Sequence, residues 1–270
     1  MINIHYALQT CDTKSYQSQK RFCGDDKTEL SMKSVKSFLQ SIKHCSELKK
    51  DAIHNIAIID DHSTEKLKVY HKKCKQDLET DNIKIELINL SDKQGISASI
   101  RECYKWLDVN GTDLVYQVQD DYIFIEQAIY EMIDIFYQIF CETENHCIVS
   151  PFNDPYLWNA VYKNKVVPRT VVVGKHRYWI QNYDTSCSFL TSHYQFKQHW
   201  DLYDKFLYLT EYKDKGLESK SLNYLFTQRG ILGLVPINSM AFHMQSDFEK
   251  DPYIDWKPIW DSINVTSATT

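Results

Sequence analysis

The stretch Ile56-Ala57-Ile58-Ile59-Asp60-Asp61-His62-Ser63 passes from an apolar run directly to two acids and a turn. Its first four residues are apolar and mostly β-branched, which favours a short strand. Asp, His and Ser then interrupt the apolar run, as expected where a strand ends in a loop. The stretch therefore predicts a strand whose carboxyl end carries two neighbouring carboxylates.

Similar apolar runs lie on both sides of this stretch and alternate with segments of helical period. Strands are predicted at residues 2–8, 56–59, 83–88 and 114–118. Between them apolar residues recur at i, i+3, i+4 and i+7, most clearly at Val35, Phe38, Leu39 and Ile42. This alternation is typical of βαβ units, so the sequence predicts an α/β fold with a mostly parallel central sheet.

Beyond residue 150 the alternation stops and aromatic residues become frequent. Six of them lie close together in the sequence: Tyr156, Trp158, Tyr162, Tyr178, Trp179 and Tyr183. This half of the chain is expected to form a binding face. Further on, a helix is predicted over Ser219–Arg229, ending at Gly230, with a strand over Ile231–Ile237.

Composition excludes several classes of protein. The 270 residues are 43% hydrophobic and 25% charged, which describes a globular chain with a sizeable core. A net charge of −5 argues against a nucleic-acid partner. The chain lacks an apolar run near the roughly 20 residues that a bilayer span needs, and it starts without a signal-like segment, so a cytoplasmic location is expected. The 8 cysteines are scattered, which favours free thiols over a zinc site.

Two groups of polar residues follow predicted strands directly. Asp60-Asp61 follow the strand at 56–59, and Gln119-Asp120-Asp121 follow the strand at 114–118. Ligands of parallel sheets bind beyond the carboxyl ends of the strands, so both groups are expected at one edge. Carboxylates gathered there repel one another unless a divalent cation or a hydrogen-bond donor offsets the charge. Alternatively, each pair serves only a structural role, as turn or cap residues.

Three segments together resemble one family. Ile58–Thr64 resembles the "V-V-D-D-x-S-T" turn of nucleotide-sugar-dependent glycosyltransferases with the GT-A fold, in particular the inverting, family-2-like members. Asn89–Arg101 is similar to their "N-x-G-x-x-x-A-x-N" segment. Gln119–Asp121 stand in the place of their "D-x-D" motif, where Gln119 replaces an acid.

The resemblance implies a single Rossmann-like domain over residues 1–270, with three α/β/α layers. Within it, residues 1–145 are expected to bind the nucleotide sugar, 146–260 the acceptor, and 261–270 to form a flexible tail. By the same resemblance the nucleotide sugar contacts Thr10, Asp60, Asp61, Gly95, Arg101, Gln119 and Asp120. Asp120 is expected to contact ribose or a metal-bound water.

The metal and the catalytic base are also implied by resemblance. Asp121 is expected to bind Mn²⁺ or Mg²⁺ directly, and His243 resembles a C-terminal histidine that some GT-A enzymes use on the metal or the diphosphate. Glu218 begins a segment similar to "E-D-x-x-L-x-x-R-x-x-x-G", in which an acid is the base, although Ser219 replaces the second acid. Glu211 is the alternative base.

Each of these residues could instead have a purely structural role. Glu218 could be a first-turn acid that favours the helix dipole. His243 could be a packing residue, and Arg101 a solvated helix residue. The C-terminal residues Tyr253, Asp255, Trp256 and Trp260 are expected to form a packing cluster without chemistry.

The resemblance therefore implies a metal-dependent, inverting glycosyltransferase. It would move a sugar from a UDP- or GDP-sugar to a hydroxyl of a glycan or glycoconjugate, in surface glycan synthesis. Two alternatives remain open. A sugar-nucleotide nucleotidyltransferase would need a glycine-rich loop after the first strand, whereas Gln9–Asp12 contains no glycine. A catalytically silent nucleotide-sugar-binding protein is compatible with Gln119 and Ser219.

Overall fold

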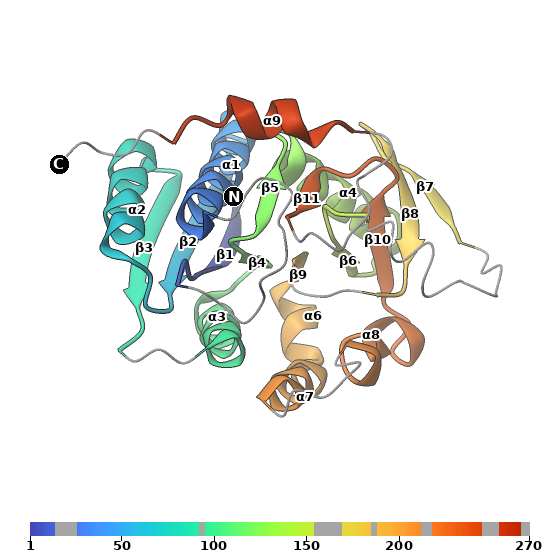
Figure 1. Ribbon diagram of the computed structural model, residues 1–270. Coiled ribbons are helices and arrows are strands. Elements are labelled where there is room, and N and C mark those ends of the chain that lie inside the picture. Colours follow the sequence, from blue (N-terminus) through green and yellow to red (C-terminus); the bar gives the residue numbers. More distant parts are fainter. Residues whose placement is uncertain are drawn as a thin grey trace.

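The computed structural model describes residues 1–13, 26–91, 95–153, 169–184, 188–211, 218–244 and 254–265, and the statements below refer to these. Their main feature is one sheet of 9 strands with helices on both faces (Figure 1). In order across the sheet the strands are β3 (Ile83–Asn89), β2 (Ala52–Asp60), β1 (Ile2–Thr10), β4 (Leu114–Gln119), β9 (Phe189–Ser192), β6 (Cys147–Val149), β10 (Leu232–Pro236), β8 (Tyr178–Asn182) and β7 (Val171–Val173).

The first four strands of this order are parallel, as the βαβ pattern predicts. Beyond β4 the sheet is mixed, because β9 pairs antiparallel with both β4 and β6. Strands from both halves of the chain thus form one continuous sheet. The α/β architecture is confirmed, and it is consistent with the GT-A fold that the sequence resemblance implies.

Two layers of helices cover the sheet, one on each face. One layer contains α1 (Lys27–Leu48), α2 (Glu65–Leu78) and α4 (Ala128–Thr143). The other contains α3 (Ile96–Asn110), α6 (His193–Gln198), α7 (Trp200–Glu211) and α8 (Tyr224–Thr227). Strand β1 supplies both cores by alternation, since Tyr6 and Leu8 pack against the first layer and Ala7 against the second.

A small second sheet extends beyond the end of β4. It pairs β5 (Tyr122–Phe124) antiparallel with β11 (Ala241–His243). Helix α9 (Trp256–Ser262) covers it, and its side chains form a third apolar cluster with Phe242 and Met244. The expected C-terminal packing cluster is therefore confirmed for Trp256 and Trp260, while Tyr253 lies outside the described residues.

The predicted tail at 261–270 begins too early. Residues 261 and 262 belong to α9, and Ile263 is buried in the third cluster. The sequence contains no stop signal at 261, and apolar contacts of Ile263 and Val265 continue the packing past the helix. Residues 266–270 lie outside the described residues.

The predicted helix over 219–229 is confirmed only for residues 224–227. A 3₁₀ turn, η1 (Glu218–Lys220), comes first, and the short helix α8 follows it. Serine and asparagine at 219, 221 and 223 are weak helix formers, and burial of Leu222 and Leu225 holds the broken segment in place. Gly230 does end the segment in the left-handed region, with φ 70°.

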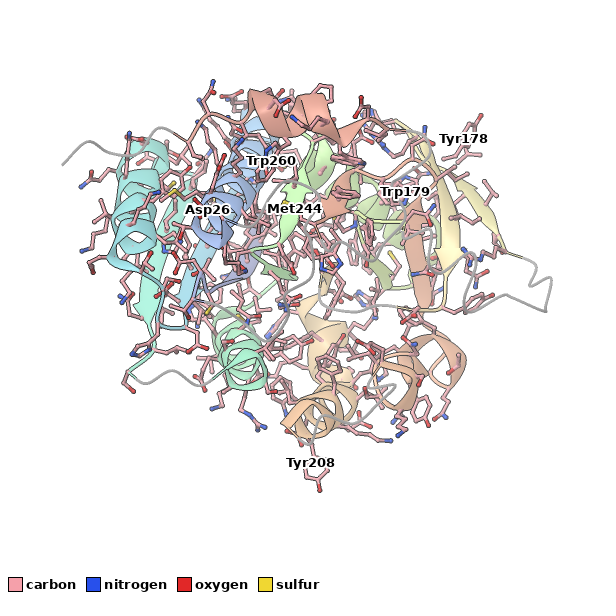
Figure 2. The ribbon with its side chains drawn as sticks, viewed as in Figure 1. Asp26, Tyr178, Trp179, Tyr208, Met244 and Trp260 are labelled. Carbon is pink, nitrogen blue, oxygen red and sulfur yellow. The ribbon has the colours of Figure 1, made fainter. Side chains whose placement is uncertain are left out.

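The aromatic half only partly forms a face. Trp179 is 1% exposed and belongs to the core, whereas its neighbour Tyr178 is 59% exposed and points outward (Figure 2). Alternation along β8 explains the difference, because successive side chains of a strand point to opposite faces. Tyr156, Trp158 and Tyr162 lie outside the described residues.

Within the described part of the chain, we find no helix with both the length and the apolarity needed to cross a membrane.

Candidate active site

The two acidic pairs lie on either side of the end of β1. Strand β1 is between β2 and β4 in the sheet, with Thr10 in register with Asp60 and Gln9 in register with Gln119. The Thr10 hydroxyl donates to Asp60 Oδ1 at 3.0 Å, and the next backbone N–H, that of Cys11, donates to Asp120 Oδ2 at 3.0 Å. The acids at 60–61 and at 120–121 therefore converge on one edge of the sheet, as predicted.

The first corner of this edge, Asp60–Asp61, is closed by donors of the chain itself. Asp60 Oδ2 accepts from the backbone N–H of Ser63, three residues further on, at 3.1 Å. Asp61 Oδ2 accepts from the Gly95 backbone N–H at 2.8 Å. Both acids are almost fully buried, with 2% and 1% of their surface exposed. They hold the loop after β2 to the start of α3.

Gly95 is the N-cap of α3 and has φ 82°, a conformation that favours glycine. Its contact with Asp61 connects the "N-x-G" segment to the acidic turn. Arg101 lies further along α3 and is half-buried. Gln119 reaches the same helix indirectly, because its Nε2 donates to Gln9 Oε1 at 3.2 Å and Gln9 in turn contacts Ser99.

Asp12 is a third acid of this edge that the sequence reasoning missed. Its Oδ1 accepts from the Thr64 backbone N–H at 2.7 Å, and its Oδ2 accepts from the Thr28 hydroxyl at 2.8 Å. It therefore joins the end of β1 to the starts of both α1 and α2. The rule that found the other acids, a carboxylate just after a strand, applies to Asp12 as well. The sequence argument used this stretch only for its lack of glycine, so it assigned Asp12 no role.

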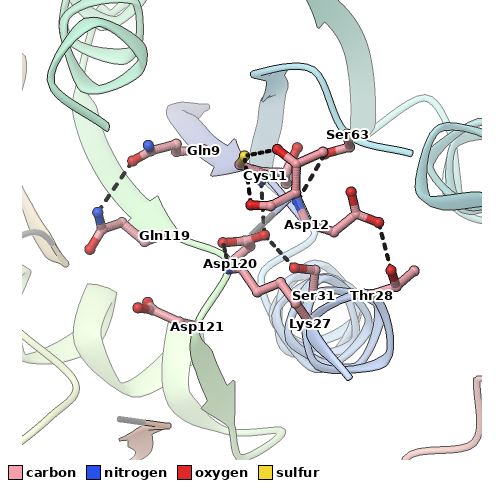
Figure 3. Close-up of polar contacts among 12 residues, drawn as sticks. Gln9, Cys11, Asp12, Lys27, Thr28, Ser31, Ser63, Gln119, Asp120 and Asp121 are labelled. Atoms are coloured by element: carbon pink, nitrogen blue, oxygen red, sulfur yellow. Dashed lines mark hydrogen bonds and ion pairs between the residues drawn. The ribbon is translucent and has the colours of Figure 1, made fainter. Parts of the chain in front are cut away.

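Asp120 and its neighbour Asp121 point in opposite directions (Figure 3). Asp120 faces α1, where Lys27 Nζ lies 3.2 Å from Oδ1 and the Ser31 hydroxyl donates to Oδ2 at 2.5 Å. With the Cys11 N–H, three donors from two segments hold this carboxylate.

Asp121 instead faces the small sheet. Its Oδ2 lies 3.0 Å from His243 Nε2. The ladder of β5 and β11 puts His243 in register with Tyr122, and the two rings stack with centroids 4.6 Å apart. The Met244 backbone N–H donates to the Asp121 carbonyl at 2.9 Å. Pairing of two strands that are distant in the sequence thus brings the two predicted metal ligands together.

A carboxylate and an imidazole are donors that suit Mn²⁺, and Mg²⁺ in proteins often uses one or two carboxylates together with phosphate oxygens and water. Among the described residues, no group of three or more His, Cys, Asp or Glu is arranged to hold a metal. The Asp121–His243 pair alone offers two donors, so an ion held there would need its remaining ligands from other molecules, such as phosphate oxygens and water.

Glu218 comes from a different element of the chain than the two acidic pairs. It begins η1, where its carbonyl accepts from the backbone N–H of Ser221 and of Asn223. Burial raises the pKa of its carboxyl above the ordinary 4.5, and the charge of Asp184, which follows β8, raises it further. The acids at 120–121 contact β1, α1 and β11, whereas the charged neighbour of Glu218 comes from the loop after β8. Glu211, the alternative base, is the last residue of α7.

The free cysteines include one at this edge. Cys11 is half-buried, while Cys45, Cys74, Cys103 and Cys147 are buried and Cys141 is exposed, all as free thiols. The expectation of free thiols is confirmed for these six. Cys23 and Cys187 lie outside the described residues.

No family model and no curated protein matches the chain. Solved structures match in part. Staphylococcus aureus TarS, residues 1–349, is 12% identical over 73% of this chain and 49% of its own, with a TM-score of 0.44. GalNAc-T7 with UDP, GalNAc and Mn²⁺ is 11% identical over 96% of this chain and 47% of its own, with a TM-score of 0.48.

A mannosyltransferase from Pyrobaculum calidifontis, in complex with GDP-Man and Mn²⁺, is 8% identical over 56% of this chain, with a TM-score of 0.38. The chain spans less than half the length of each of these proteins, 36% in this last case. At this level of likeness the matches assign no role to any residue of the site, so the functional argument rests on the site itself.

Proposed function

We propose that this chain is a metal-dependent, inverting glycosyltransferase that moves a sugar from a nucleoside-diphosphate sugar to a hydroxyl acceptor. The observation that supports this proposal most is the Asp121–His243 pair beyond the end of β4. In the sheet, β1 separates β4 from β2, which ends at the first corner, Asp60–Asp61. A donor that carries a nucleoside at one end and a diphosphate at the other suits two such corners. The family resemblance of the same segments agrees with this assignment.

The donor is placed along the carboxyl edge of the sheet. Its nucleoside would lie by Thr10, Asp60 and Asp61, with Gly95 and Arg101 contributing from the α3 side. Its diphosphate would lie beside Asp121 and His243, whose side chains are 22% and 12% exposed, against 8% for Asp120. Gln119 would lie between the two ends of the donor.

Each residue then has a chemical task. Asp121 and His243 would hold Mn²⁺ or Mg²⁺, which when bound neutralises the charge that develops on the leaving diphosphate. Glu218 would take the proton of the acceptor hydroxyl while the hydroxyl oxygen attacks the anomeric carbon from the face opposite the leaving diphosphate. A carboxyl whose pKa is raised is a stronger base than an ordinary one, provided that it is ionised at the working pH. The acceptor is expected to be a glycan or glycoconjugate.

Two other functions share this site and predict different products. A sugar-nucleotide nucleotidyltransferase would release or consume pyrophosphate. A silent binding protein would bind the nucleotide sugar without turnover, and it is compatible with Gln119 and Ser219, which replace acids of the family motifs.

One incubation tests the three functions. The purified chain is mixed with UDP- or GDP-sugars and Mn²⁺, and the products are followed by chromatography. Slow release of UDP or GDP that stops on addition of a chelator supports the glycosyltransferase. Pyrophosphate formation supports the nucleotidyltransferase. Donor binding by calorimetry without any product supports the silent protein and contradicts our proposal.

A further inference from the structure

We infer that Asp120 is a positioning residue, clamped by Lys27 and Ser31 of α1, and that this clamp aims Asp121 at His243. The inference rests on the proposed function, because it concerns how the same metal and diphosphate site is held. It differs from the expectation that Asp120 contacts the ribose or a metal-bound water.

The carboxylate of Asp120 is held by three donors. The ammonium of Lys27 lies 3.2 Å from Oδ1, and Oδ2 accepts from the Ser31 hydroxyl and from the Cys11 N–H. The side chain of Asp120 is only 8% exposed, and that of Lys27 16%. A carboxylate with three donors in a buried setting is expensive to reorient, because breaking the pair leaves an uncompensated charge. Asp120 therefore stays directed at α1.

Two of these donors, Lys27 and Ser31, come from the beginning of α1. Lys27 and Ser31 are four residues apart, so they project from one side of the helix. Asp26 caps α1 by accepting from the backbone N–H groups of Thr28 and Glu29, which fixes where the helix begins. Thr28 also donates to Asp12 at the end of β1. The start of α1 is thus bonded both to Asp12, which follows β1, and to Asp120, which follows β4.

The turn between β4 and β5 connects the held Asp120 to Asp121. Asp120 and Asp121 are its two residues. Asp120 is held to α1 on one side, and the Asp121 carbonyl accepts from the Met244 N–H on the other. With both sides of the turn fixed, the Asp121 carboxylate has little freedom to leave its place 3.0 Å from His243. Loosening the clamp should therefore weaken metal binding without touching the nucleoside.

A second ion pair on the same helix provides a matched control. Lys49, which follows the other end of α1, contacts Asp134 of α4, with side chains that are 21% and 15% exposed. Both pairs join a lysine at an end of α1 to a partly buried aspartate, and Asp134 also contacts His176 and Lys175. Only the Lys27 pair lies at the acidic edge, so Lys49→Met removes an ion pair of α1 but should leave ligand binding unchanged.

The experiment measures affinity by calorimetry for three probes: Mn²⁺ alone, UDP or GDP with Mn²⁺, and the matching nucleoside without metal. We expect Lys27→Met to weaken the two Mn²⁺-dependent affinities about tenfold, the lower end of the range for the loss of a residue that orients a metal ligand. Lys27→Arg should restore them to within about twofold, because it keeps a charged donor. Nucleoside affinity should not change in either variant. Ser31→Ala, which removes a single hydroxyl, should show a smaller loss in the same direction.

A double-mutant cycle separates positioning from direct contact. If Lys27 acts through Asp120, the variant Lys27→Met with Asp120→Asn should bind no more than about twofold worse than Asp120→Asn alone. Multiplication of the two losses would mean that Lys27 contacts the diphosphate itself, and would overturn the inference. A loss of nucleoside affinity in Asp120→Asn would assign Asp120 to the ribose and would overturn it as well.

The inference and the proposed function fail in different ways. Wild-type protein that binds neither Mn²⁺ nor nucleotide overturns both. Wild-type protein that binds them, with Lys27→Met and Ser31→Ala equal to it in every affinity, overturns the clamp alone. Circular dichroism of each variant confirms that it is folded before its affinities are compared.

Discussion

The two acidic corners of the sheet edge use similar sequences in different ways. At the first corner, Asp60 and Asp61 are buried and accept hydrogen bonds from backbone N–H groups that shape the loop after β2. At the second, the two acids divide the work, since Asp120 faces α1 and Asp121 faces His243. A pair of acids after a strand can thus build the fold, provide a ligand, or do both. Substitutions at the two corners should therefore separate stability from binding.

The largest expected effect is at Asp121. Asp121→Ala removes a proposed metal ligand, so we expect Mn²⁺-dependent donor binding and transfer to fall by about 100-fold or more. Thermal stability should stay nearly unchanged, because the fold of the turn depends on the backbone bond to Met244. Calorimetry with UDP or GDP and a thermal melt measure both quantities. Wild-type donor affinity in this variant would remove the proposed role of Asp121.

A comparable loss of transfer, without loss of binding, is expected at Glu218, which lies outside both corners. Glu218→Gln keeps the shape of the side chain but removes the group that accepts a proton. We expect donor binding to persist and transfer to fall by about 100-fold or more. Product formation is measured beside donor affinity in the same preparation. Full activity would transfer the role of base to another residue, with Glu211 the next to test.

At the first corner the effect on stability should be the larger one. Asp60→Ala leaves the Thr10 hydroxyl and the Ser63 N–H without their acceptor in a buried setting. We expect the free energy of unfolding to fall by about 2 kcal/mol, measured in urea. Asp60→Asn tests the nucleoside contact with less disturbance. If Asp60→Ala is as stable as the wild type, the first corner is not the structural one and the comparison fails.

The sequence predicts the parallel half of the fold well because each of its elements is local. The runs at 2–8, 56–59, 83–88 and 114–118 are all strands, and the helical periods between them are all helices. The mixed half is harder, because β9 pairs with β4 and β6 through contacts distant in the sequence. No local pattern specifies that choice of partners.

The candidate site divides in the same way. The convergence of the two acidic pairs follows from the shared edge of parallel strands and was predicted. The choice of direction at Asp120 and Asp121 depends on Lys27, Ser31 and His243, which come from α1 and β11. Spacing along the chain contains no information on such contacts. Asp12 was missed for a simpler reason, since it lies four residues beyond the predicted strand at 2–8, whereas β1 continues to Thr10.

The smallest expected effect concerns pH and joins Glu218 to its acidic neighbour. Burial and Asp184 both raise the pKa of the Glu218 carboxyl, so its proton leaves at a higher pH than that of an ordinary glutamate. If the carboxylate is the base, transfer should decline as the pH falls through this raised pKa. Asp184→Asn removes one negative charge, which lowers the pKa and should move the acid limb of the pH–rate profile to lower pH.

The measurement is kcat at saturating donor across the acid range, in wild type and Asp184→Asn. Burial is the larger cause of the raised pKa, so most of the shift should remain in the variant. Asn182 donates to the backbone carbonyl of residue 184 rather than to its side chain, so the loop after β8 keeps that bond. An acid limb that does not move, or that moves to higher pH, would mean that the profile reports another group than Glu218.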